Sequence, residues 1–172
     1  MERKELCIIS DSDIPSGSGG INGEGYTYGQ LRHQPIITEI LQRITHPIAR
    51  KMAEDCNERN RKDGFTMYKV DSEYCFEGLR VGPKVKIPSK DELLALLGDQ
   101  PINAATIRNI TYTLIRKELA RLYGTSVQEA ADIISNQLDC APHEDISGYI
   151  FMIPNWAHKW FRHNGYVARM LK

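Results

Sequence analysis

The chain has 172 residues, of which 41% are hydrophobic and 26% charged, a composition that suits one folded domain of ordinary size and argues against disorder. Lysine and arginine together number 22, as do aspartate and glutamate, so any contact with nucleic acid must come from a local patch rather than from net charge. No run of apolar residues is long enough to span a bilayer, and the apolar run 6–9 is too short for a signal peptide, so we expect a cytoplasmic protein with no membrane partner.

The N-terminal segment predicts a short strand followed by an arm. Residues 6–9 are continuously apolar, and residues 15–29 are rich in glycine and serine. This segment lacks the spacing of a phosphate-binding loop, since no lysine follows its glycines. Its composition predicts a mobile arm, and the functional alternative is an arm that becomes ordered on a protein partner.

A helical pattern begins at Pro35. Apolar residues recur at steps of three and four and form one stripe: Ile37, Ile40, Leu41, Ile44, Ile48, Met52 and Cys56. Pro47 should kink this helix or split it in two, because proline lacks the backbone donor and clashes with the preceding turn. The opposite face, which includes Arg59, mixes both charge signs and is interpreted as a solvated face.

The middle of the chain predicts two or three antiparallel strands and then a set of helices. The strand runs are 65–70, 74–81 and 84–88, which are rich in β-branched and aromatic residues. A helix should begin at the capping-box pair Ser89 and Glu92 and end at Gly98.

A longer helix is expected over 104–123, with an inward face consisting of Ile107, Ile110, Leu114, Ile115, Leu119 and Leu122. A second capping box, Ser126 and Glu129, should open a helix that reaches about Leu138. Ala120, Gly124 and Ala130 are spaced as in a helix-turn-helix. Two acidic residues and no basic one lie early in the second helix, which favours simple helix packing over DNA recognition.

The C-terminal segment contains the chain's strongest functional pattern. Cys140, His143, His158 and His163 are spaced C-x2-H-x14-H-x4-H, close to the spacing of zinc-finger ligands. Thiolate and imidazole are the ligands that zinc prefers. These four residues are therefore candidate ligands of a divalent metal ion, zinc or magnesium.

The stretch "HEDISGYIFMIPNWAHKWFRHNG" resembles the end of the Trp-His-His branch of the HNH nuclease superfamily. That branch reads approximately H-H-x-D, a turn, a hydrophobic strand ending in Val-Pro, and then x3-H-x4-H-x-G. The matching positions are His143, Asp145, Pro154, His158, His163 and Gly165. The resemblance covers about 25 residues, and Cys140, Ala141 and Pro142 stand where the family's Trp-His-His motif is expected.

The resemblance implies a ββα unit that hydrolyses phosphodiester bonds in DNA or RNA with a divalent metal ion. His158 and His163 would hold the metal, and His143 would be either the general base or a ligand, with Cys140 able to supply a missing ligand. Asp145 or Glu144 would orient the ring of a metal-binding histidine through its second nitrogen. Four cations could contact backbone phosphate: Lys159, Arg162, Arg169 and Lys172.

Two other interpretations stay open. In one, the metal serves only the fold; in the other, the histidines are incidental. In either case the protein is a non-catalytic regulatory or inhibitory factor, of the kind that mobile elements encode, that binds a protein or nucleic acid. The overall expectation is an α+β fold, mostly helical, with a small antiparallel sheet. Residues 1–139 would form the body, and residues 140–172 would form a metal-binding ββα-like unit.

Overall fold

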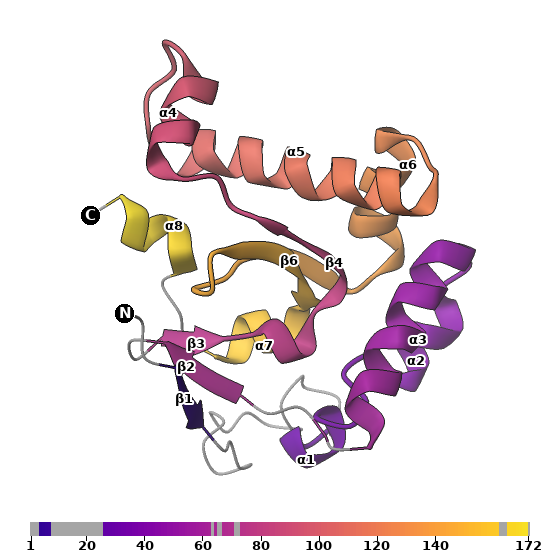
Figure 1. The fold of residues 1–172 in the computed structure, drawn as a ribbon. Helices are drawn as coiled ribbons and strands as arrows, with labels where there is room; N and C mark the ends of the chain where they lie inside the picture. The colour runs from indigo at the N-terminus through magenta and orange to yellow at the C-terminus, as the bar shows by residue number, and fades with distance from the viewer. Residues whose placement is uncertain are drawn as a thin grey trace.

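The fold is α+β, as the sequence predicts (Figure 1). The computed structural model describes residues 4–7, 26–62, 64, 67–70, 73–161 and 165–171. Within them lie two antiparallel three-stranded sheets, in the orders β1-β2-β3 and β4-β6-β5. The strands are β1 (Lys4–Cys7), β2 (Met67–Val70), β3 (Glu73–Cys75), β4 (Val81–Lys86), β5 (Cys140–Glu144) and β6 (Tyr149–Pro154).

The helices make up most of the remaining structure. They are α1 (Tyr28–Leu31), α2 (Thr38–Arg43), α3 (Pro47–Arg61), α4 (Lys90–Leu97), α5 (Ala104–Tyr123), α6 (Val127–Asp132), α7 (Asn155–Trp160) and α8 (Gly165–Met170). A 3₁₀ turn, η2 (Glu77–Leu79), precedes β4, and a π-helical turn, η3 (Ile133–Gln137), follows α6. No helix in the described part of the chain combines the length and the apolar character needed to cross a bilayer.

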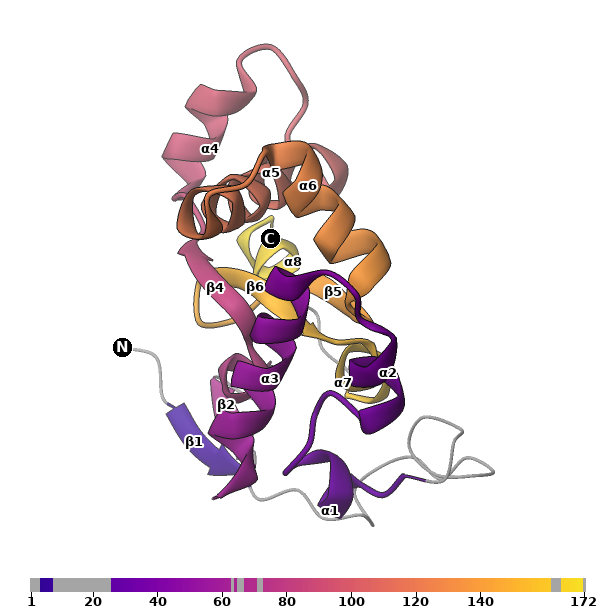
Figure 2. The same ribbon diagram turned by 90° about the vertical axis from the view of Figure 1, so that its right-hand side faces the viewer.

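The second sheet has a separate apolar core on each face, because successive side chains of a strand point to opposite sides. On one face, Met152 of β6 packs in a cluster with α3, α5 and η3. On the other face, Phe151 packs with α1, η2 and α7. Figures 1 and 2 show α5 above this sheet, and Figure 1 shows α7 below it. A fully enclosed side chain such as Phe151 contributes about 1.5 to 3 kcal/mol through burial.

Proline splits the first helical pattern, as predicted. α2 ends at Arg43, and α3 begins with Pro47 in its first turn, where a missing N–H costs no hydrogen bond. His46 takes the N-cap position, and its Nδ1 accepts from the backbone N–H of Ile48 at 3.2 Å.

Capping and periodicity also predict α4 and α5 correctly. Ser89 and Glu92 form a reciprocal capping box at the start of α4, and Gly98 ends that helix with φ 60°. α5 spans Ala104–Tyr123 and stops at Gly124, which is left-handed. The prediction for Leu122 was wrong: this residue is 50% exposed, because no element among the described residues covers the end of the helix on that side.

The second predicted capping box is only half formed. The Ser126 hydroxyl accepts from the N–H of Glu129 at 3.0 Å, but the Glu129 carboxylate turns to His46 Nε2 at 2.7 Å. Ala130 is fully buried, and α6 packs against α5 at the turn, as expected for simple helix packing.

Two expectations about organisation need revision. Only residues 15–25 of the expected arm lie outside the described residues. At its end, Tyr28 is 2% exposed and begins α1, so 26–29 is packed structure.

The expected boundary at residue 139 runs through one sheet, because β6 is the central strand between β5 and β4. The C-terminal hairpin is therefore completed by a strand from the middle of the chain.

Candidate functional site

The C-terminal segment folds as two antiparallel strands followed by a helix. β5 and β6 pair in register, with His143 opposite Phe151. A tight turn joins them, in which Gly148 has φ 88° and donates its N–H to the Asp145 carbonyl at 2.9 Å. α7 follows β6 directly after Pro154.

The start of α7 is tied to the body by side-chain hydrogen bonds. Asn155 Nδ2 donates to Asp139 Oδ1 at 2.8 Å, and the Trp156 indole N–H donates to the Pro35 carbonyl at 2.9 Å. Because Trp156 is 7% exposed, its burial and this bond together fix the direction in which α7 leaves the sheet.

His143 is buried on the sheet face that α7 covers. It is 3% exposed, and its ring lies edge-on to Phe76 with ring centroids 4.8 Å apart. His158 lies on the exposed side of α7, and its ring centroid is 5.9 Å from that of His143. The fold thus brings the strand histidine and the first helix histidine of the sequence motif together.

Asp145 holds His143 in place. Its Oδ1 lies 3.0 Å from His143 Nε2 and accepts the Phe76 N–H at 2.8 Å. Its Oδ2 accepts the Ser147 N–H at 3.0 Å and the Cys75 thiol at 3.2 Å. Burial is the largest influence on the pKa of the Asp145 carboxyl and raises it, but the hydrogen bond and charge of His143, with the other donors, bring the pKa below its usual value.

The ionised state of Asp145 fixes the tautomer of His143. An ionised carboxylate only accepts hydrogen bonds, so Nε2 of His143 carries the proton. Nδ1 is then the nitrogen that gains or loses the second proton, so it acts as a base or a metal ligand only when the ring is neutral. A histidine oriented in this way by a carboxylate is a recurring arrangement for both tasks.

Cys140 does not share this site. It lies three residues before His143 on the same strand, so the two side chains point to opposite faces of the sheet. Its thiol packs in the cluster formed with α3 and η3, and burial raises its pKa well above the usual value. Because the thiolate is the metal-binding form, this environment opposes ligation.

Glu144 also faces away from His143. Its carboxylate accepts the buried Thr111 hydroxyl at 2.7 Å, and Arg108 Nε lies 3.8 Å away. Burial raises the pKa of this carboxyl, and these two partners lower it by less. Asp145 is therefore the acidic residue that orients His143.

The remaining predicted residues are only partly described. His163, Arg162 and Lys172 lie outside the described residues, as does the side chain of Arg169, while Lys159 is exposed beside His158. Among the described residues, no three His, Cys, Asp or Glu side chains are arranged to hold a metal ion.

The sequence did not indicate two neighbours of the site, Cys75 and Phe76. Cys75 ends β3 and Phe76 follows it, and both reach Asp145 across about 70 residues of chain. Cys75 has no nearby base in the sequence, so no local pattern could connect it to the histidines.

No protein-family model matches the chain, and no similar protein is found among the curated proteins or the solved structures.

Proposed function

We propose that the β5-β6-α7 unit is a metal-assisted phosphodiester hydrolase site that acts on DNA or RNA. The observation that supports it is the approach of the His143 and His158 rings to 5.9 Å. At this separation a single water molecule could contact both the His143 ring and an ion held at His158, which is what a general base beside a metal requires. A strand histidine and a helix histidine at this separation agree with the arrangement that the family resemblance implies.

In this proposal His143 is the general base and Asp145 is its positioning residue. His143 takes a proton from water at Nδ1, the oxygen of that water bonds to phosphorus, and the bond to the leaving sugar oxygen breaks. Asp145 keeps Nε2 protonated and stabilises the imidazolium that forms. His158, together with His163, would hold a divalent ion, which when bound stabilises negative charge on the phosphate and leaving oxygen.

Nucleic acid would approach from the exposed side of α7. His158 and Lys159 are both exposed there, whereas His143 lies beneath them against Phe76 and Phe151. Lysine contacts phosphate as a point charge and carries no base specificity. The proposed substrate contact is therefore independent of nucleotide sequence.

A second candidate function is supported by the burial of the His143–Asp145 pair. Asp145 is fully buried and accepts four donors, from His143, Phe76, Ser147 and Cys75. Such a saturated carboxylate joins β3, β5 and the turn, which is a sufficient structural role. The protein would then be a non-catalytic regulatory factor.

The test compares two exposed histidines. Wild type, His158→Ala and the control His33→Ala are incubated with plasmid DNA and with RNA in the presence of Mg²⁺, Mn²⁺ or Zn²⁺, and bound metal is measured by mass spectrometry. We expect cleavage by wild type and by His33→Ala, and loss of bound metal and at least a 100-fold slower rate for His158→Ala. His143→Ala should lose about 10²- to 10⁴-fold in rate. Absence of cleavage by wild type with every ion rejects the hydrolase and leaves the non-catalytic function.

A further inference from the structure

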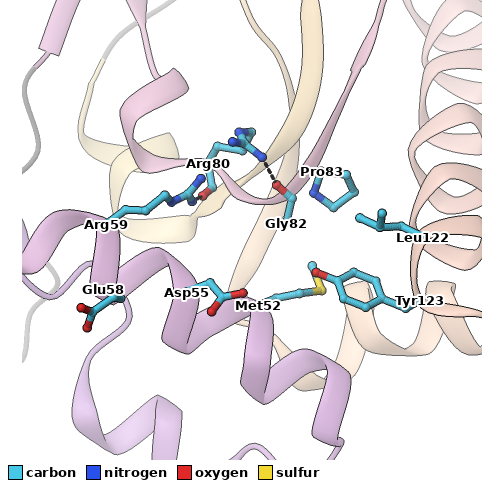
Figure 3. Close-up of a pocket in the computed structure, with 9 residues that line it drawn as sticks. All are labelled: Met52, Asp55, Glu58, Arg59, Arg80, Gly82, Pro83, Leu122 and Tyr123. Atoms are coloured by element: carbon cyan, nitrogen blue, oxygen red, sulfur yellow. Dashed lines mark hydrogen bonds between the residues drawn. The ribbon is translucent and has the colours of Figure 1, made fainter.

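A pocket of about 420 Å³ lies on the opposite side of the second sheet from His143. It is formed where α3, the start of β4 and the C-terminal end of α5 meet (Figure 3). Val81 of β4 pairs with Met152, and both pack in the cluster on the Cys140 face, whereas His143 and Phe151 lie on the other face. The pocket is therefore distinct from the candidate hydrolase site.

Two arginines line one side of this pocket. Arg59, from α3, donates to the backbone carbonyl of Arg80, and Arg80 Nη1 donates to the carbonyl of Gly82 (Figure 3). Neither guanidinium forms an ion pair with a carboxylate of the described residues, and Arg80 Nε is buried without a hydrogen-bond partner among them. Burial lowers the pKa of Arg80, and the positive charge of Arg59 lowers it further.

The acidic residues of the pocket do not neutralise these arginines. Asp55 pairs with Lys51 at 3.3 Å and Glu58 pairs with Arg61 at 2.8 Å, one turn away along α3 in each case. Each acid is thus matched by a cation outside the pocket, and the two arginines remain as excess positive charge. Holding two guanidinium groups close together is unfavourable unless an anion lies between or beside them.

The remaining wall is apolar and includes an aromatic ring. Met52, Pro83 and Leu122 line it together with Tyr123, whose phenol projects toward the pocket from the end of α5 (Figure 3). Leu122 is 50% exposed and lies at the mouth. The volume is within the range of small-molecule sites, which combine apolar walls with a few polar groups.

We propose that this pocket binds a small organic anion. A phosphate or carboxylate group lies against Arg59 and Arg80, whose planar guanidinium groups match the oxygens of either, and a flat apolar body lies against Tyr123 and Pro83. The bound anion relieves the repulsion between the two arginines. This function does not depend on the hydrolase proposal.

Calorimetric titration at low ionic strength tests the proposal with four probes: phenyl phosphate, benzoate, inorganic phosphate and phenol. We expect saturable 1:1 binding of phenyl phosphate, of benzoate, or of both, with inorganic phosphate weaker and phenol not binding. The tighter of the two aromatic anions identifies the preferred head group. If neither aromatic anion binds wild type saturably, or if phenol binds as tightly as they do, the proposal is overturned.

Variants then place the bound anion in the pocket. Arg59→Gln and Arg80→Gln should each weaken binding at least about tenfold, since a charge-assisted hydrogen bond is lost. Arg121→Gln is the matched control, because it makes the same change of charge near the end of α5 but outside the pocket lining. There Arg121 pairs with Glu118. An affinity unchanged in Arg59→Gln would overturn the proposal.

Two variants of Leu122 with opposite charges keep the test decisive if Arg80→Gln does not fold. Leu122→Lys and Leu122→Glu both place a long side chain at a half-exposed position and differ in the sign of its charge. We expect Leu122→Lys to bind the anion more tightly than wild type and Leu122→Glu more weakly. Equal affinities in the two variants would reject an anion site at this mouth.

Discussion

His46 Nε2 lies 2.7 Å from the Glu129 carboxylate, and this contact joins the start of α3 to the first turn of α6. The other ring nitrogen of His46 caps α3 by accepting the Ile48 N–H. One half-buried side chain therefore serves two helices that are about 80 residues apart in sequence.

We expect His46→Ala to lower the free energy of unfolding by about 1 to 2 kcal/mol, because it removes a cap and the hydrogen bond to the Glu129 carboxylate together. Glu129→Gln should cost about 0.5 kcal/mol, because it replaces a charged acceptor of the His46 hydrogen bond by a neutral one. Denaturant unfolding measures both. His33→Ala is the control, since the exposed His33 ring approaches only the Arg61 carbonyl among the contacts described. Equal costs for the two histidine variants would refute the capping role.

The Cys56 thiol makes stability depend on alkaline pH. It is fully buried, and this burial raises its pKa to about 11, with Arg59 and Arg80 acting in the opposite direction. Because the folded protein holds this proton more tightly than the unfolded chain does, the stabilisation is complete below about pH 9 and is lost as the pH rises toward 11. The loss amounts to about 2 to 3 kcal/mol.

Cys56→Ala isolates this effect from other groups that titrate in the same range. The variant should be less stable than wild type at pH 7, because it leaves a cavity, but the difference should narrow between pH 9 and 11. Urea unfolding at each pH measures the difference. A constant gap across this range would show that Cys56 does not titrate there.

Cys140→Ala should leave any metal binding intact. The Cys140 thiol lies on the face of the sheet opposite His143. Its loss should therefore cost about 1 kcal/mol of packing without changing the bound metal or the cleavage rate. Metal analysis and thermal unfolding of the purified variant measure the two effects. A loss of metal with unchanged stability would restore Cys140 as a ligand.

Gly82 is required where β4 passes under α3. It has φ 83°, and a Cβ built on it would lie 2.4 Å from the terminal methyl of Met52. We expect Gly82→Ala to cost about 2 to 3 kcal/mol, from left-handed strain and from displacement of Met52. Gly124→Ala is the matched control, because Gly124 is left-handed at φ 68° with nothing within 4 Å of an added Cβ, so only the strain of about 1 kcal/mol applies. Similar losses in both variants would remove the role of Met52.

Local signals predicted most helices because their causes are local. The capping box at Ser89, the split at Pro47 and the stop at Gly124 each depend on residues within one or two turns. Strand pairing depends on distant partners. The run 84–88 was therefore recognised as a strand region, but its pairing with β6 rather than with the neighbouring strands β2 and β3 was not.

In the candidate site, too, the features with local causes were predictable and those that depend on distant residues were not. The order of two strands and a helix agrees with what the family resemblance implies, whereas the choice of Asp145 over Glu144 as the partner of His143 needed the structure. Cys140 was misplaced because ligand spacing was considered without the alternation of a strand. The pocket beside Arg80 was missed because Arg59 was assigned to a solvated face, and nothing in the sequence indicates that Leu122 stays uncovered.

The position of β6 between β4 and β5 has a consequence for biosynthesis. While the chain is being synthesised, β4 leaves the ribosome long before Tyr149–Pro154 exists, so its edge and the apolar faces of α3 and α5 remain without their main partner. An unpaired strand edge beside exposed apolar surface is the usual starting point of aggregation. We therefore expect the nascent chain to be most prone to aggregation in the interval before its last strands emerge and close the sheet.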